Sequence, residues 1–293
     1  RDLYSKFKGL DDKGSEQKDP YHREKPIPAF IKEVKDTIKN YNIDFIYFTD
    51  ESFLSMSSDR FEEFIEAYSK IKVPFFIESR VETVKPDYAE ALEKINCTGI
   101  AMGVESGSLA LRKNLLSRMM PDEKIIKGFK EFEKTNIRIS ANNIIGFPGE
   151  SREDIMLTIE INRKINPDSI VVNAFRPYSG TKLRKICIDK GLIPKEERAE
   201  DNRAYGAFNN GILKGNELEN IRKVFALYVT FPKNRWKEIR EAETNTGLYK
   251  ELMKEYERKE LFNGKNRDNS GDSIHENISA QDIFINDEGT VVI

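Results

Sequence analysis

IRISANNIIGFPGE, residues 137–150, carries the clearest fold signal in this chain. The segment begins with β-branched residues typical of a buried strand and ends in a Gly-Phe-Pro-Gly turn that Glu150 closes. Residues 151–154 (SRED) then open a helix in which Ile155 and Ile159 recur at helical spacing. A buried strand that runs through a tight turn into a helix is half of a βαβ unit. Such folds bind ligands where the carboxyl ends of the strands meet the helix starts.

The same strand-and-helix unit repeats along the chain. Five short apolar runs end near residues 48, 79, 103, 145 and 175, at spacings of roughly 30 residues, the usual length of a βα repeat. These repeats predict an α/β fold whose parallel sheet curls into a full or partial TIM-type barrel. A flat doubly wound sheet is the alternative, but no Gly-rich phosphate fingerprint supports it. We also expect Asp59 and Glu62 to form a capping box in the helix after the first strand.

The alternation of strands and helices stops after residue 190. We therefore divide the chain into a barrel at 1–190, a helical extension at 191–262, a flexible polar linker at 263–281 and a terminal β-hairpin at 282–293. A lone hairpin is only marginally stable, so we expect this one to need a partner surface.

Composition narrows the class of protein and its location. Of 293 residues 33% are charged, but 48 bases and 50 acids leave a net charge of −2, which gives no argument for nucleic acid or a membrane surface. No apolar run approaches the ~20 residues that a transmembrane helix needs. No signal peptide is visible, so we expect a cytoplasmic protein. The two cysteines, Cys97 and Cys187, indicate a reducing compartment and are interpreted as small core residues.

Two kinds of active site are disfavoured by the motifs. The chain has two His residues and no CxxC, HxxxH or HExxH pattern, which argues against a self-contained zinc site. The segment GVESG at 103–107 has Glu105 where a hydrolase elbow has serine, so a hydrolase is rejected.

Polar residues gather at the ends of four consecutive predicted strands. Parallel strands bring such residues to one rim, which predicts a binding site there. Each of them has the alternative role of capping the next helix, although four strand ends in succession weaken that reading. The residues are Asp50, Glu51, Ser79, Arg80, Glu105, Ser106, Asn142 and Asn143.

The strand-end motifs FTDESF (48–53), GVESGS (103–108), NNIIGFPGE (142–150) and RPYSGTKL (176–183) resemble the radical S-adenosylmethionine (SAM) superfamily. The resemblance covers roughly residues 1–230 and is strongest to the group that carries a cobalamin-binding domain ahead of the barrel. It implies a partial (β/α)6 barrel. The family's CxxxCxxC loop, which binds a 4Fe–4S cluster, is absent from the sequence. We expect the loop and the first strand to lie upstream of Arg1, which makes the five strands here the second to sixth.

The resemblance also implies roles for particular residues. Glu51, beside Asp50, aligns with the acid that holds the SAM ammonium, although Thr49 and Asp50 replace the glycines of the family's Gly-Gly-Glu motif. Arg118 matches the base that pairs with the SAM carboxylate; its alternative is a solvated helix-end charge. The remaining implied SAM contacts are Glu105 and Ser106 near the ribose and Asn143, Ile145, Gly146 and Glu150 in the adenine-side motif. Arg80 and Arg176 are candidates to meet an acidic group of the substrate, and surface salt links are their alternative.

The implied chemistry is reductive cleavage of SAM at the cluster to a 5′-deoxyadenosyl radical that acts on an unknown small-molecule substrate. Methyl transfer with cobalamin is one outcome that the resemblance allows. The resemblance further implies a reductant such as flavodoxin or ferredoxin, and no activity for residues 1–293 alone. One alternative is a degenerate barrel that binds a small molecule or a partner without radical chemistry. Another is a sugar-phosphate barrel, for which residues 179–181 offer a thin phosphate-binding turn.

Overall fold

The computed structural model describes residues 24–196, 208–263, 284–285 and 291–292. The described residues up to Tyr256 form one compact unit, and those from Glu257 onward belong to a second. The predicted linker at 263–281 lies outside the described residues apart from Asn263. The division of the chain into four parts therefore stays a prediction.

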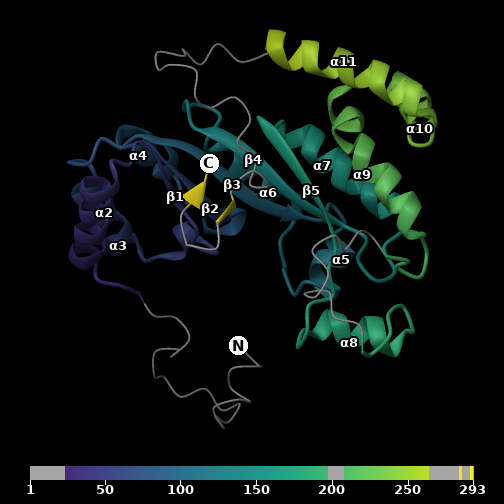
Figure 1. Ribbon diagram of the computed structural model, residues 1–293, viewed down its shortest axis with the longest axis horizontal. Coiled ribbons are helices and arrows are strands. Elements are labelled where there is room, and N and C mark those ends of the chain that lie inside the picture. The colour runs from purple at the N-terminus through teal and green to yellow at the C-terminus, as the bar shows by residue number, and fades with distance from the viewer. Residues whose placement is uncertain (1–23, 197–207, 264–283, 286–290, 293) are drawn as a thin grey trace. The chain divides into compact units, whose positions relative to one another are not determined.

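Five parallel strands form one sheet, in the order in which they occur along the chain (Figure 1). Every pair of neighbours is parallel, so all five carboxyl ends lie at one edge. The predicted α/β fold with five consecutive strands is confirmed, and the sheet is consistent with a partial barrel. The strands are β1 (Ile46–Phe48), β2 (Phe75–Arg80), β3 (Cys97–Glu105), β4 (Arg138–Ile145) and β5 (Ser169–Ala174).

Helices connect each strand to the next. Helix α7 begins where the sequence predicts, because Ser151 and Asp154 form a reciprocal capping box. The capping prediction for α3 is wrong: the N-cap is Ser57, whose hydroxyl accepts a hydrogen bond from the Arg60 N–H, and Asp59 lies inside the first turn. The helices before β5 are α2 (Ile27–Tyr41), α3 (Ser58–Tyr68), α4 (Tyr88–Lys94), α5 (Leu109–Asn114), α6 (Asp122–Lys130) and α7 (Arg152–Ile165), with short 3-10 turns η1 (Phe53–Ser55) and η2 (Val81–Thr83).

Successive side chains along each strand point to opposite faces of the sheet, and the two faces differ in burial. One face is buried against the helices; Ile77, Met102 and Ala141 belong to its core. The opposite face, which we call the open face, carries side chains most of which are only partly buried or exposed. It includes Tyr47, Phe76, Glu78, Arg80, Gly103, Arg138, Ser140, Asn142 and Ile144. This alternation decides which strand residues can reach a ligand on the open face.

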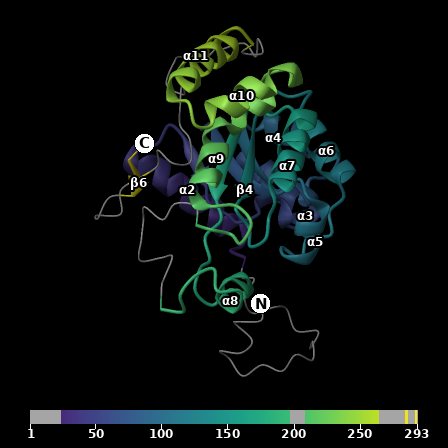
Figure 2. The ribbon, with the colours of Figure 1, turned by 90° about the vertical axis from the view of Figure 1, so that its right-hand side faces the viewer.

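Helices after β5 complete the first unit. α8 (Lys182–Asp189) supplies Cys187 to a small core beneath the turns that follow β4 and β5. α9 (Gly215–Thr230) packs against β5 and against α7, which lies beside it in Figure 2, and α10 (Trp236–Ala242) joins the same core. α11 (Thr246–Asn263) follows. In the second unit β6 (Phe284–Ile285) and β7 (Val291–Val292) pair antiparallel. No helix among the described residues is long and apolar enough to cross a membrane.

Gly107 allows the turn after β3 to touch α7. Its N–H donates to the Thr158 hydroxyl at 2.8 Å, and a Cβ on Gly107 would fall inside contact distance of the Leu157 carbonyl group. Gly107→Ala should therefore lower the free energy of unfolding by about 2 kcal/mol, because rigid backbone must move. Urea unfolding would measure the loss.

The control for this substitution is Gly247→Ala, at the start of α11. A Cβ there would meet only the Asn245 side-chain oxygen, at 3.4 Å, and alanine favours helix. Equal stabilities of the two variants would contradict the close-contact explanation.

Candidate functional site

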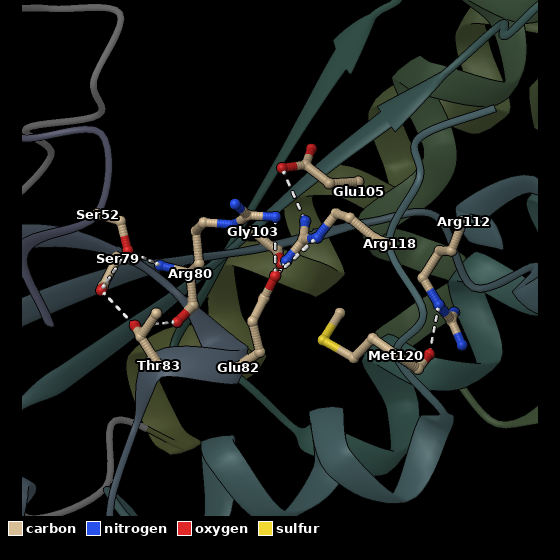
Figure 3. Close-up of polar contacts among 10 residues, drawn as sticks. All are labelled: Ser52, Ser79, Arg80, Glu82, Thr83, Gly103, Glu105, Arg112, Arg118 and Met120. Carbon is tan, nitrogen blue, oxygen red and sulfur yellow. Dashed lines mark hydrogen bonds and ion pairs between the residues drawn. The ribbon is translucent and has the colours of Figure 1, made fainter. Parts of the chain in front are cut away.

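Four charged side chains of alternating sign lie at the carboxyl ends of β2 and β3, over the open face (Figure 3). Glu82 accepts from two atoms of Arg118, with Nε to Oε1 at 3.2 Å and Nη2 to Oε2. Arg118 Nη1 donates to Glu105 at 3.4 Å, and Arg80 Nη2 lies 2.9 Å from Glu82 Oε1. We call Arg80, Glu82, Arg118 and Glu105 the charge cluster.

The end of β3 is shaped to admit these side chains. A Cβ on Gly103 would lie 2.5 Å from Glu105 Oε1 and 3.6 Å from Arg118 Nη1, so a larger residue there would displace the cluster. The register with β4 shifts between Gly103 and Glu105, and Glu105 has a φ of +64°. A non-glycine residue in this left-handed region is strained, and such strain is common at functional sites.

Arg112 holds the loop that carries Arg118. Its fully buried guanidinium donates to the Met120 carbonyl at 3.0 Å and to the Ser106 carbonyl at 2.7 Å. The Arg118 N–H donates to the Arg112 carbonyl at 2.8 Å. The backbone on both sides of Arg118 is therefore fixed to the turn after β3.

The two carboxylates of the charge cluster differ electrostatically. Burial raises the pKa of Glu105; the Arg118 charge opposes this effect and the Glu82 charge adds to it. Burial also acts to raise the pKa of Glu82, but the hydrogen bonds and charge of Arg118 outweigh it and hold that pKa below its ordinary value. Glu82 is therefore the ionised partner of Arg118, whereas Glu105 is the weaker acid.

Hydroxyl groups fix the loop after β1 against the end of β2. Ser79 Oγ accepts from the Leu54 N–H at 3.0 Å and lies 3.0 Å from Thr83 Oγ1, and Ser52 Oγ accepts from the Arg80 N–H at 3.3 Å. This loop carries the predicted residues Asp50 and Glu51, both exposed. The loop thus places Glu51 at the same edge of the sheet as the charge cluster.

The turn after β4 uses Glu150 for its own structure. The buried Glu150 carboxyl accepts from the Gly146 N–H and, at 3.2 Å, from the Phe147 N–H. Asn210 donates to the carbonyls of Phe147 and Glu150 at 3.0 and 2.9 Å. Gly146 has a φ of +90°, which only glycine adopts easily. The N–H of Gly146 is therefore engaged, and Glu150 stabilises the turn from within.

The structure places two predicted SAM contacts on the helix-covered face. Asn143 is fully buried and donates to Asn162 Oδ1 at 3.2 Å, and the Ile145 side chain lies in the core of α7 and α9. Their neighbours Asn142 and Ile144 face the open side instead, because side chains alternate along a strand. Ser106 is also buried, and its hydroxyl accepts from the Ser108 N–H at 3.2 Å.

Sequence reasoning missed several residues on the open face. Glu82 lies two residues after the end of β2. The sequence Arg80-Val81-Glu82 could have indicated it, because it places an acid two residues from a base at a strand end. Tyr47 donates to Glu78, and its ring stacks on Phe76 with centroids 5.2 Å apart. The period-2 alternation of β2 could have revealed Glu78. Of the two predicted substrate-contacting arginines, Arg80 belongs to the charge cluster, and Arg176 is half-buried just after β5.

The residues present do not fit a 4Fe–4S cluster. The part of the chain that the structure describes contains no group of three or more His, Cys, Asp or Glu side chains able to hold a metal ion. Cys97 and Cys187 are buried in separate cores, and burial raises the pKa of the Cys97 thiol to about 12. Neither cysteine lies on the open face, in agreement with their interpretation as core residues.

A family comparison identifies the class of protein. The profile described as "Radical SAM superfamily" matches residues 7–161, more than half of the chain. The chain therefore belongs to the radical SAM superfamily, and the predicted radical SAM enzyme is confirmed at the level of the superfamily.

Curated relatives share part of the chain. An uncharacterized methyltransferase of Pyrococcus horikoshii is 25% identical over 168 residues, which cover 57% of this chain and 36% of the relative. A probable threonylcarbamoyladenosine tRNA methylthiotransferase of the same organism is 30% identical over 149 residues, covering 45% of this chain and 35% of the relative. The chain spans about a third of the length of these relatives.

A solved structure supports the fold. The cobalamin-dependent S-adenosylmethionine radical enzyme OxsB, with aqua-cobalamin bound, superposes with a TM-score of 0.51 at 15% identity. The match covers 78% of this chain and 43% of that one. It agrees with a partial barrel of the radical SAM type.

Glu150 should make stability depend on pH. Burial raises its pKa from an ordinary 4.5 to about 8, although the Gly146 and Phe147 N–H groups oppose the shift. Between these values the folded protein holds a proton that the unfolded chain has lost. The free energy of unfolding should therefore fall as pH rises, by at most about 1.4 kcal/mol per pH unit from this group.

Glu150→Gln cannot ionise and provides the test. The unfolding free energy of the variant minus that of the parent should be larger at about pH 8 than at about pH 5. Urea unfolding at both pH values would measure the difference. A difference that is independent of pH would contradict the raised pKa.

Proposed function

We propose that this chain provides the SAM-binding barrel of a radical SAM enzyme, and that SAM binds at the carboxyl edge of the open face. The observation that carries the proposal is the charge cluster, because its alternating charges suit a zwitterionic amino acid group. Glu51 at the end of β1, Glu105 at the end of β3 and Gly146 after β4 lie at the same edge. Membership of the superfamily supports SAM as the ligand.

Particular side chains are assigned to the parts of SAM. Arg118 binds the carboxylate, Glu51 the ammonium and Glu105 the ribose hydroxyls. On β4 the open face offers Asn142 and Ile144 for polar and apolar contact with the nucleoside, in place of the side chains of Asn143 and Ile145; the backbone groups of Ile145 keep their proposed role. Bound SAM would supply, on reduction, the radical that abstracts hydrogen from a substrate. The chain's own contribution is to position SAM and to exclude water from it.

The 4Fe–4S cluster implied by membership of the superfamily is the proposed source of the electrons that reduce SAM. The sequence has two cysteines, fewer than the three thiolates of the family's cluster loop. We propose that the cluster ligands precede Arg1 in the full protein, that flavodoxin or ferredoxin is the reductant, and that cobalamin is held by a preceding domain.

Methyl or methylthio transfer is the proposed reaction class. The names of the curated relatives, a methyltransferase and a methylthiotransferase, support it. One relative modifies tRNA by name, but the net charge of −2 favours a small-molecule substrate here. Arg80 and Arg176 are proposed to meet an acidic group of that substrate. We propose a cytoplasmic enzyme that acts without a membrane partner.

The alternative is a degenerate barrel that binds a small molecule or partner without radical chemistry. The sequence of the complete protein separates the two proposals. Three cysteines at the family's spacing ahead of residue 1 support the enzyme, and their absence supports the binding protein.

Replacing both Glu51 and Arg118 with alanine should weaken SAM binding at least tenfold, because each contributes a charge-assisted hydrogen bond to the amino acid group. The measurement is calorimetric titration of SAM into the full-length protein, anaerobically reconstituted. An unchanged circular dichroism spectrum would show that the fold is intact. Unchanged SAM affinity in a folded double variant would overturn the assigned roles.

A further inference from the structure

We infer that Glu82 is a positioning residue, which holds the Arg118 guanidinium in the orientation that receives the carboxylate of SAM. The inference rests on the proposed function, because it takes Arg118 as the carboxylate-binding base. It assigns a role to a residue that is 36 positions away from Arg118 in the sequence and lies on a different element.

The nitrogen atoms of the Arg118 guanidinium differ in their hydrogen bonds: Nε and Nη2 are bonded within the protein, whereas Nη1 is only weakly engaged. Glu82 takes one hydrogen from Nε and one from Nη2, and the Gly103 carbonyl takes the other Nη2 hydrogen at 3.2 Å. Among the described residues, Nη1 contacts only Glu105, at 3.4 Å. Its second hydrogen has no acceptor among the described residues. The end that carries Nη1 therefore remains able to bind an anion over the open face.

Glu82 is itself rigidly supported. It lies in the 3-10 turn η2, directly after β2, and the Val84 N–H donates to the Val81 carbonyl at 3.3 Å. Thr83 Oγ1 donates to the Arg80 carbonyl at 2.6 Å, which fixes the start of the same turn (Figure 3). Gly128 of α6 packs against Val81, where a Cβ would meet the Val81 side chain and carbonyl. A carboxylate on so fixed a turn can define the position of a long side chain.

The charges explain why the position matters for binding. Arg118 is buried, with a side-chain exposure of 8%, and its two nearest carboxylates belong to Glu82 and Glu105. Without Glu82, the guanidinium would turn fully to Glu105, and the carboxylate of SAM would have to compete for it. Glu82 fixes the rotamer of Arg118 already in the folded protein. The entropy cost of ordering this side chain therefore does not reduce the affinity for SAM. Arg80 brings a second positive charge to Glu82, because its Nη2 lies 2.9 Å from Oε1, the oxygen that also accepts from Arg118 Nε.

The test compares SAM affinity in cluster-reconstituted full-length protein by anaerobic calorimetry. Glu82→Ala should raise the Kd for SAM by about ten- to a hundredfold, as expected for a lost hydrogen bond to a charged group. Glu82→Gln keeps the shape of the side chain and should give a smaller rise, which secures the test if the alanine variant fails to fold.

The matched control is Glu238→Ala. Glu238 accepts from Nε and Nη2 of Arg235, at 2.8 and 3.1 Å, which repeats the side-on geometry of Glu82 and Arg118 far from the open face. This variant should bind SAM like the parent. A rise in the Kd for SAM equal to that of Glu82→Ala would overturn the inference, because the loss of any Arg–Glu pair would then weaken SAM binding.

A double-mutant cycle separates positioning from a structural role. If Glu82 acts through Arg118, Glu82→Ala should change the Kd little in a protein that already carries Arg118→Ala. In the reductive cleavage of SAM, Glu82→Gln should raise the KM for SAM and leave kcat within about twofold of the parent. A further loss of affinity in the double variant would indicate a structural role and overturn the inference.

The outcomes also distinguish this inference from the proposed function. If Arg118→Ala alone leaves the SAM affinity unchanged, the assigned carboxylate contact is wrong, and the inference is wrong with it. If Arg118→Ala weakens binding but folded Glu82→Ala and Glu82→Gln do not, only the positioning role is overturned.

Discussion

Burial of one face of the parallel sheet is the constraint on which the rest of the structure depends. Helices cover the side chains of Ile77, Met102 and Ala141, so their strand neighbours must point to the open face. Because the strands are parallel, the polar residues that end them arrive at one edge. The site is thus a consequence of how the core is formed.

The charge cluster shows how such an edge can hold buried charges. A guanidinium removed from water is costly unless its hydrogen bonds are satisfied. Arg118 meets that condition through Glu82 and the Gly103 carbonyl, and Glu105 provides a third, longer contact. The alternation of two bases and two acids keeps the net charge near zero without a ligand. This arrangement favours a ligand that brings both a negative and a positive group.

Motif residues serve two different purposes in this fold. Glu150 and Ser106 belong to the motifs that indicated the radical SAM superfamily, yet both are buried in the turns that they stabilise. Arg112, which lies outside these motifs, has a similar structural role because it fixes the loop of Arg118. Membership of a superfamily is therefore readable from residues that need not touch the ligand. The shape of the turns is part of the signature because it positions the side chains of the candidate site.

The sequence by itself determined the five strands, their parallel arrangement and the edge at which the residues of the candidate site gather. Local sequence patterns are enough to predict these features, because β-branched runs and turn residues determine the conformation of a few neighbouring residues. Only the tertiary structure decided that Asn142 and Ile144, not Asn143 and Ile145, face the open side, because a shift of one residue reverses the direction of every side chain. It alone brought Glu82 to Arg118. The physical reason is that a pairing across two loops depends on how β2, β3 and α5 pack, which no single segment encodes.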